Sequence, residues 1–196
     1  MKIIVIGASG TIGRAVVAAL KPAHEVIEVS HSRSSHTLDM SNVGSIRKMY
    51  ADVGRIDAVL SVAGQARFKP LAALSDEDLD FSLRNKLMGQ VNLVRLGLDC
   101  VNDGGCITLT SGVLSQRPIP GSAAISLVNA GVEAFARAAA LEAPRGIRVN
   151  VVSPPWVKET LVAMGMDPGP GKAAADVAMA YVTSLTGSMT GAVIEA

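Results

Sequence analysis

Short apolar runs alternate with longer segments of helical periodicity along most of the chain. The first run, residues 2–6, has the length and β-branched composition of a strand that is buried on both faces. Residues 14–20 follow with the spacing of a helix. Strands that alternate with helices are typical of a doubly wound parallel sheet. The pattern predicts strands over residues 2–6, 25–30, 37–39, 57–62, 105–110, 147–152 and 192–194.

Helices are predicted between these strands. Ser75 stands before three acidic residues, so it can cap a helix whose positive end suits their carboxylates. This helix is predicted to run to about Val101. The fold class is therefore α/β, a three-layer, doubly wound Rossmann-type fold with about seven parallel strands, and the expected domain is a single one over residues 1–196. The other predicted helices cover residues 14–20, 45–53, 122–143 and 173–184.

Composition and charge narrow the class of protein. Hydrophobic residues make up 49% of the chain and aromatic residues only 3%, so Ala, Val, Leu and Ile must build the core. The net charge of +1 gives no reason to expect nucleic acid or an anionic membrane as a partner. No apolar run is expected to span a bilayer, and the first strand leaves no room for a signal peptide. Cys100 and Cys106 lack metal-site spacing and suit core thiols, so a cytoplasmic protein without a metal is expected.

A glycine-rich turn joins the first strand to the first helix. Gly7 allows a tight exit from the strand, Gly10 allows a diphosphate to approach the backbone, and Gly13 allows close packing of helix and strand. The helix would then direct its free N–H groups and its positive end toward phosphates. A tight turn without a ligand is the alternative, but this position in an α/β chain favours dinucleotide binding.

Four stretches resemble one known family. The turn, Ala63-Gly64, Thr110-Ser111 and residues 149–154 fall in the order and spacing of the short-chain dehydrogenase/reductase family. The resemblance covers nearly the whole chain. It implies a Rossmann-type sheet of seven strands, a nicotinamide cofactor, and hydride transfer to or from a small-molecule carbonyl or alcohol.

The resemblance also implies a set of cofactor contacts. Ser111 matches the family serine that orients the substrate carbonyl, although a serine that satisfies a strand end is the simpler reading of the residue alone. Pro155 stands where the family usually has glycine. The implied contacts come from Ser9, Thr11 and Ile12 at the phosphates, Asp39 and Met40 at the adenine, Ala63 and Gly64 at the adenosine ribose, and Pro154, Trp156, Val157 and Thr160 at the carboxamide.

The end of the second strand bears on the choice of cofactor. NAD enzymes of this fold usually carry an acidic residue there to bind the ribose hydroxyls. This chain has Ser32, Arg33 and Ser34 instead. A guanidinium and serine hydroxyls suit a 2′-phosphate, so NADP(H) is expected in preference to NAD(H). A solvated polar loop is the alternative reading of these residues.

The family's catalytic Tyr-x-x-x-Lys pair is absent. The matching positions hold Ile125 and Asn129, and Ile has no proton to donate. Lys86 stands where the family has an Asn, so the Lys and Asn residue types look exchanged. Lys86 and Asn129 would then form an ammonium–amide pair in which each residue stands at the position where the family has the other. In the alternative alignment Asn85 is the family Asn, and Lys86 lies on a solvated face.

Two functions remain open at this point. One is an NADP(H)-dependent oxidoreductase with an altered site that contains Ser111, Lys86 and Asn129. The other is a catalytically silent NADP(H)-binding protein or redox sensor. The Ala-rich residues 130–143 and the family resemblance predict a homodimer through the two long helices.

Overall fold

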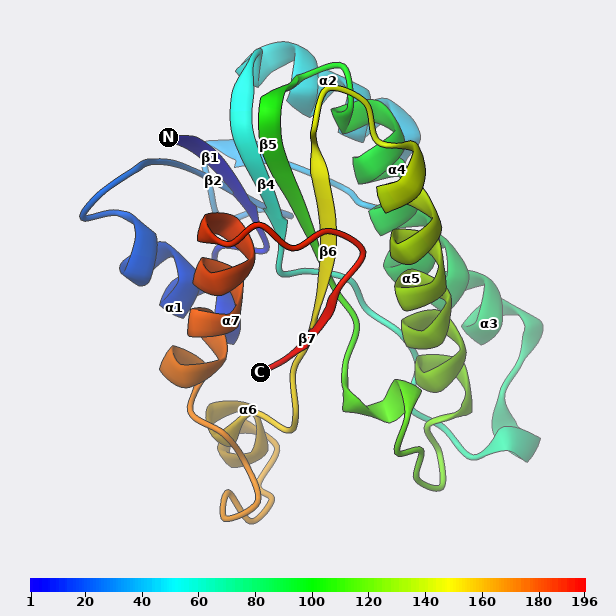
Figure 1. Ribbon diagram of the computed structural model, residues 1–196. Helices are drawn as coiled ribbons and strands as arrows, with labels where there is room; N and C mark the ends of the chain where they lie inside the picture. The colour runs from blue at the N-terminus through cyan, green and yellow to red at the C-terminus, as the bar shows by residue number, and fades with distance from the viewer.

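A seven-stranded parallel sheet forms the centre of the computed structural model, which describes all 196 residues. The strand order is β3-β2-β1-β4-β5-β6-β7, and it changes direction between β1 and β4. In open α/β sheets, ligands bind outside the carboxyl ends of strands at such a switch point. In Figure 1 these ends lie toward the bottom of the view. The strands are β1 (Lys2–Ile6), β2 (Glu25–Ser30), β3 (His36–Thr37), β4 (Ile56–Ser61), β5 (Val101–Thr110), β6 (Arg148–Ser153) and β7 (Val193–Glu195).

Helices cover both faces of the sheet and complete the three predicted layers (Figure 1). α1 and α7 lie on one face, and α2, α4 and α5 lie on the other. Each face holds its own apolar cluster of aliphatic side chains, with Tyr50 in one and Tyr181 in the other. The helices are α1 (Thr11–Leu20), α2 (Val43–Val53), α3 (Asp76–Ser82), α4 (Gly89–Gly97), α5 (Ala123–Glu142), α6 (Lys158–Ala163) and α7 (Ala174–Thr186).

The prediction of one long helix from Ser75 to about Val101 is wrong in two respects. The helix is interrupted, and it ends before Val101. Ser75 does cap it, with a capping box that includes Asp78. α3 then gives way to a π-helical turn, Leu83–Met88, and α4 ends at Gly97. A π-helical turn accommodates an extra residue, and such turns are frequent at functional sites. The interruption places Lys86 inside the molecule, as described below.

Other boundaries differ from the sequence prediction by a few residues, and one short helix is additional. The third strand comprises only His36–Thr37, and the chain turns away before Asp39 because this edge strand pairs with β2 alone. β5 begins at Val101, earlier than predicted. Residues 158–163 form α6, which no prediction included.

α5 corrects one prediction about composition. By length and composition alone, Ala123–Glu142 is long and apolar enough to cross a membrane. This is contrary to the expectation that no apolar run could span a bilayer. In the fold, however, α5 packs beside β6 and buries Val128, Val132 and Ala136. Its apolar character is therefore explained by its place in one layer of the fold.

Candidate active site at the carboxyl edge of the sheet

Three adjoining cavities lie along the carboxyl edge of the sheet. The first, here called the turn cavity, has a volume of about 630 Å³ and lies beside Gly7 and Ser9. The second, the lysine cavity, has about 480 Å³ and is lined by Lys86, Ser111 and Asn129 among others. The third, the tryptophan cavity, has about 160 Å³ and lies beside Trp156. The first two share Gly64, and the last two share Asn129, so the three form one continuous site.

The glycine turn forms one wall of the turn cavity. Gly7 has a φ of +84°, which favours glycine, and a Cβ on Gly13 would collide with the carbonyl oxygen of Gly7. α1 therefore approaches β1 more closely than any side chain would allow. The helix has no side-chain cap, and the N–H groups of Thr11, Ile12 and Gly13 have no partner in the protein. Such free N–H groups at a helix start suit an anion.

Eight of the seventeen predicted cofactor residues line the turn cavity, whereas Gly10, Thr11, Ile12 and Gly13 of the turn do not. Asp39 lines it, and a hydrogen bond from the Ser41 hydroxyl (2.6 Å) holds the pKa of Asp39 below the usual value. The sequence analysis missed Phe81, Gln65 and Asn85, which come from the loop after β4 and from the helix opposite it. The full lining is Ile6, Gly7, Ser9, Ser30, His31, Ser32, Arg33, Leu38, Asp39, Met40, Ser41, Ala63, Gly64, Gln65, Phe81 and Asn85.

The loop after β2 presents Arg33 to this cavity. The backbone N–H of Arg33 donates to Ser30 Oγ at 2.8 Å, which fixes the turn, while its guanidinium has no partner in the protein. Ser32 lines the same cavity. Ser34 does not: its hydroxyl donates to Ser30 Oγ at 3.0 Å, and its side chain lines a separate depression beside His36.

Lys86 is buried, with 9% of its surface exposed, so the alternative expectation that it lies on a solvated face is wrong. Gly64, at a φ of +114°, lets the lysine stem pass: a Cβ there would lie 2.6 Å from Lys86 Cδ. The one polar contact of Lys86 Nζ is the Ser111 carbonyl oxygen at 3.5 Å. Because burial removes water from the ammonium, the pKa of Lys86 falls to about 8. Asn85 instead accepts a 2.7 Å hydrogen bond from the N–H of Gln65.

Gln90 fixes Ser111 relative to Lys86. Its side-chain Oε1 accepts from the Thr110 N–H at 2.7 Å, and its Nε2 donates to the Thr110 carbonyl at 2.8 Å. The next residue, Ser111, bonds through its N–H to Val152 in β6. Its hydroxyl is buried and has no partner in the protein. An unpaired buried hydroxyl is costly, so its presence here points to a ligand.

Asn129 lies between the lysine and tryptophan cavities. Its Nδ2 donates to the Gly112 carbonyl at 3.5 Å, whereas its Oδ1 is buried without a partner. The predicted direct pair between Lys86 and Asn129 is not formed, because each nitrogen donates to a backbone carbonyl of the segment after β5 instead. Ile125, one turn earlier, contributes an apolar wall.

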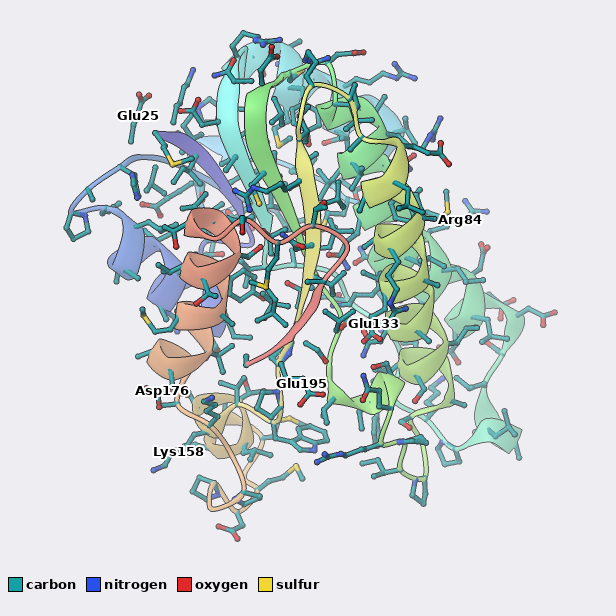
Figure 2. The ribbon with its side chains drawn as sticks, viewed as in Figure 1. Glu25, Arg84, Glu133, Lys158, Asp176 and Glu195 are labelled. Atoms are coloured by element: carbon teal, nitrogen blue, oxygen red, sulfur yellow. The ribbon has the colours of Figure 1, made fainter.

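The segment after β5 is held from α5. Ser115 donates to the buried Glu133 carboxylate at 2.6 Å, and Arg137 lies 3.6 Å from the same carboxylate. Figure 2 shows Glu133 between α5 and this segment. Because Asn129 lies one turn before Glu133, the two residues together set the position of Gly112 and the residues that follow it.

The predicted carboxamide segment is only partly exposed to the site. Pro154 and Trp156 line the tryptophan cavity together with Pro155. Val157 is packed in the core and pairs with Lys172, and Thr160 lies on α6; neither lines this cavity. The two tyrosines stay away from the lysine cavity: Tyr50 donates to the Leu93 carbonyl, and Tyr181 bonds with Thr110 on the other face of the sheet.

This arrangement is that of a nicotinamide-dependent Rossmann protein, and comparison with known proteins gives the family. A family model described as enoyl-(acyl carrier protein) reductase matches residues 11–190. The chain therefore belongs to the short-chain dehydrogenase/reductase family of oxidoreductases, which use nicotinamide cofactors. The predicted resemblance and fold class are confirmed.

Individual relatives differ in how much they share with the chain. The hydroxynaphthalene reductase arp2 of Aspergillus fumigatus is 29% identical over 150 residues, which are 72% of this chain and 55% of that one. The chain thus spans about half the length of the curated relatives it matches. The crystal structure of the protein lin1944 from Listeria innocua is 43% identical with a TM-score of 0.96, covering 100% of this chain and 98% of that one. A small-chain dehydrogenase in complex with NADPH is 27% identical with a TM-score of 0.88, covering 100% and 96%.

We predict that Lys86→Met stabilises the protein at neutral pH. The unfolded chain binds the lysine proton more tightly than the folded one, because burial lowers the pKa of Lys86 from 10.5 to about 8. Below pH 8 this difference costs about 3 kcal/mol, and the cost disappears as pH rises toward 10.5. Urea unfolding should therefore show a gain at pH 7 that shrinks by pH 10.

The matched control for this stability prediction is Lys158→Met. Lys158 is an exposed lysine on α6 (Figure 2). Its replacement should change the free energy of unfolding little, and equally at both pH values. An equal gain for Lys86→Met at pH 7 and pH 10 would show that its ammonium is not the destabilising group.

Proposed function

We propose that the protein is an NADP(H)-dependent oxidoreductase that interconverts a small carbonyl compound and its alcohol through an altered active site. The observation that carries this proposal is the shared cavity of Lys86 and Ser111, one a buried ammonium and the other a hydroxyl without a partner. The turn cavity fits the cofactor, because the glycine turn lines it with Gly7 and Ser9 and leads directly into a helix start with free N–H groups. The other predicted residues of the turn, including Ser9 and Gly10, belong to the same proposal.

The residues of the lysine cavity divide the chemistry of reduction between them. The cofactor, when bound, supplies a hydride equivalent for the carbonyl carbon. Ser111 Oγ donates a hydrogen bond to the carbonyl oxygen and orients it. Lys86 gives a proton to that oxygen as the C=O double bond becomes a C–OH single bond, and it regains a proton from solvent. Asn129 Oδ1 accepts from a water that links it to Lys86.

The proposed preference for NADP(H) depends on the loop after β2. Arg33 and Ser32 line the turn cavity, and no acidic residue ends the strand to bind a ribose 2′-hydroxyl. The free guanidinium of Arg33 can pair with a 2′-phosphate at two points. The small-chain dehydrogenase in complex with NADPH, which shares the fold, supports this choice.

A silent NADP(H)-binding protein or redox sensor is the second candidate. Ile125 favours it, because this side chain lines the cavity where the family tyrosine would act and carries no proton. The two candidates differ in one measurable property: the silent protein binds NADPH without oxidising it in the presence of any carbonyl compound.

We predict that NADPH binds more tightly than NADH and that Arg33→Ala removes most of the difference. One charge-assisted phosphate contact contributes about 1.5–3 kcal/mol, so the affinity for NADPH should fall roughly tenfold or more. Trp156 is the only tryptophan, and energy transfer from it to the bound nicotinamide provides the measurement. Arg84→Ala, at an exposed residue paired with Asp80, is the control. Equal affinities of the unchanged protein for the two cofactors would refute the preference.

We predict slow reduction of activated aldehydes that depends on Lys86. Turnover should decline as pH rises through about 8, because Lys86 loses its proton there. Lys86→Met should lower turnover at saturating NADPH by about 10²–10⁴. Lys86→Arg keeps the charge but holds its proton too tightly, so its turnover should be as low as that of Lys86→Met. Ser111→Ala should lower turnover and leave NADPH affinity nearly unchanged. Unchanged turnover in Lys86→Met at saturating NADPH would exclude the proton-donor role.

We also propose a homodimer that pairs through α5. One side of this helix presents a stripe of exposed small and apolar residues, with Leu141 89% exposed at its end. Small side chains allow close helix approach across a twofold axis. The stripe consists of Leu127, Ala130, Ala134, Ala138 and Leu141.

Light scattering at micromolar concentration tests this assembly. The unchanged protein should have twice the mass of one chain, and Ala134→Glu, which places a charge at the middle of the stripe, should reduce it to one chain. Ala173→Glu, outside the stripe, should remain dimeric. A single-chain mass for the unchanged protein would rule the dimer out.

A further inference from the structure

The lysine cavity carries one positive charge that the proposed reaction does not require, that of Arg67. Two of its lining residues, Lys86 and Arg67, are cationic, and none is acidic. Phe81 and Ile125 supply apolar walls between the polar groups. An anionic ligand with an apolar middle would match this cavity, because no lining residue carries a negative charge to balance its two cations.

We propose that the substrate is an oxo or formyl carboxylate, and that Arg67 binds its carboxylate while Ser111 and Lys86 act on its carbonyl. This inference rests on the oxidoreductase function proposed above and names its substrate class. Lys86 is buried, and the side chain of Arg67 is 47% exposed, so the carbonyl would lie deep and the carboxylate near the mouth.

The guanidinium of Arg67 is oriented for such a contact. It lies over the Phe81 ring at 3.9 Å from the centroid, and its Nε is 3.5 Å from Asp78 Oδ1. Asp78 Oδ2 also accepts a hydrogen bond from the Lys69 ammonium at 2.6 Å, so the negative charge of Asp78 is shared between Lys69 and Arg67. The two terminal nitrogens of Arg67 have no partner in the protein, and together they form the fork that binds a carboxylate at two points.

The loop that carries Arg67 is held in place at three points. The N–H of Arg67 donates to Ser82 Oγ at 3.0 Å, and the N–H of Gln65 donates to Asn85 Oδ1 at 2.7 Å. The N–H of Lys69 donates to the Gly121 carbonyl at 2.9 Å. The fork is thus positioned before a ligand arrives, which lowers the entropy lost on binding.

The cavity size agrees with this substrate class. A volume of about 480 Å³ is within the range of small-molecule sites. A benzene ring between an aldehyde and a carboxylate would place its faces against Phe81 and Ile125. 4-Formylbenzoate is therefore a suitable probe, and its methyl ester is the neutral counterpart of similar shape.

The first experiment compares NADPH oxidation with 4-formylbenzoate and with methyl 4-formylbenzoate. The ester group withdraws electrons and makes its aldehyde the more reactive of the two, so intrinsic reactivity favours the ester. We expect kcat/KM to favour the acid by tenfold or more, and this preference to weaken in high salt. Equal values, or a preference for the ester, would overturn the inference while leaving the oxidoreductase function intact.

Substitutions at Arg67 test whether this residue causes the preference for the acid over the ester. Arg67→Met should abolish the preference for the acid, because it lowers kcat/KM for the acid at least tenfold more than kcat/KM for the ester. Arg67→Lys should restore part of it, because the charge returns without the fork. Arg84→Met removes a guanidinium charge from the exposed side of the π-helical turn and should keep the full preference. If Arg67→Met retains the preference with a normal unfolding midpoint, the carboxylate does not bind there.

A binding measurement keeps this inference separate from turnover. Titration calorimetry with benzoate and benzamide, in the presence of NADP, requires no reaction. We expect benzoate to bind at least tenfold more tightly, and Arg67→Met to remove the difference. Such binding without oxidation of NADPH by either aldehyde would support the carboxylate site and refute the oxidoreductase function. No preference for benzoate would refute the carboxylate site.

Discussion

The double hydrogen bond between the Gln90 side chain and the backbone of Thr110 holds the active site together. The last pair between β4 and β5 joins Leu60 to Thr108, two residues before Thr110, so the last backbone groups of β5 face a buried space without a β4 strand beside them. Leaving a buried backbone group unpaired costs about 1–3 kcal/mol. The amide of Gln90 takes the place of the missing strand and ties α4 to the end of the sheet. Lys86 and Ser111 lie on either side of this connection, so their separation follows from it.

The buried ammonium shows how the protein combines stability with a reactive site. A lysine without a carboxylate partner is a poor choice for a core, since burial favours its neutral form. Here the surroundings leave it one carbonyl contact, and Gly64 gives its stem room to pass. Neighbouring Ser111 and Asn129 also keep buried polar atoms without partners. Two unsatisfied polar atoms and an ammonium with a single contact, all around one cavity, are understandable if a polar ligand completes them.

Membership of the family does not settle the chemistry of this chain. The fold supplies the glycine turn and the sheet edge, which relatives share, whereas function depends on the side chains around the cavity. Ile125 makes one wall apolar where the family usually has a proton donor, and in the function proposed above Lys86 supplies the proton from the opposite helix. Arg67 then adds a second cation near the mouth. The altered residues therefore form a coherent set with one electrostatic character, and they suggest a substrate that carries a negative charge.

The sequence by itself determined the layered α/β fold, because alternating buried strands and amphipathic helices leave few other arrangements. It also identified the glycine turn, since only glycine permits the contact between Gly7 and Gly13. It left the burial of Lys86 open between two alignments and did not reveal the π-helical turn, because both depend on packing against Gly64 and the end of β5. Arg67 and Phe81 had no motif to mark them, although their place after a strand end was a usable signal. Only the tertiary structure decided the site, because its groups come from separate elements that meet at one edge of the sheet.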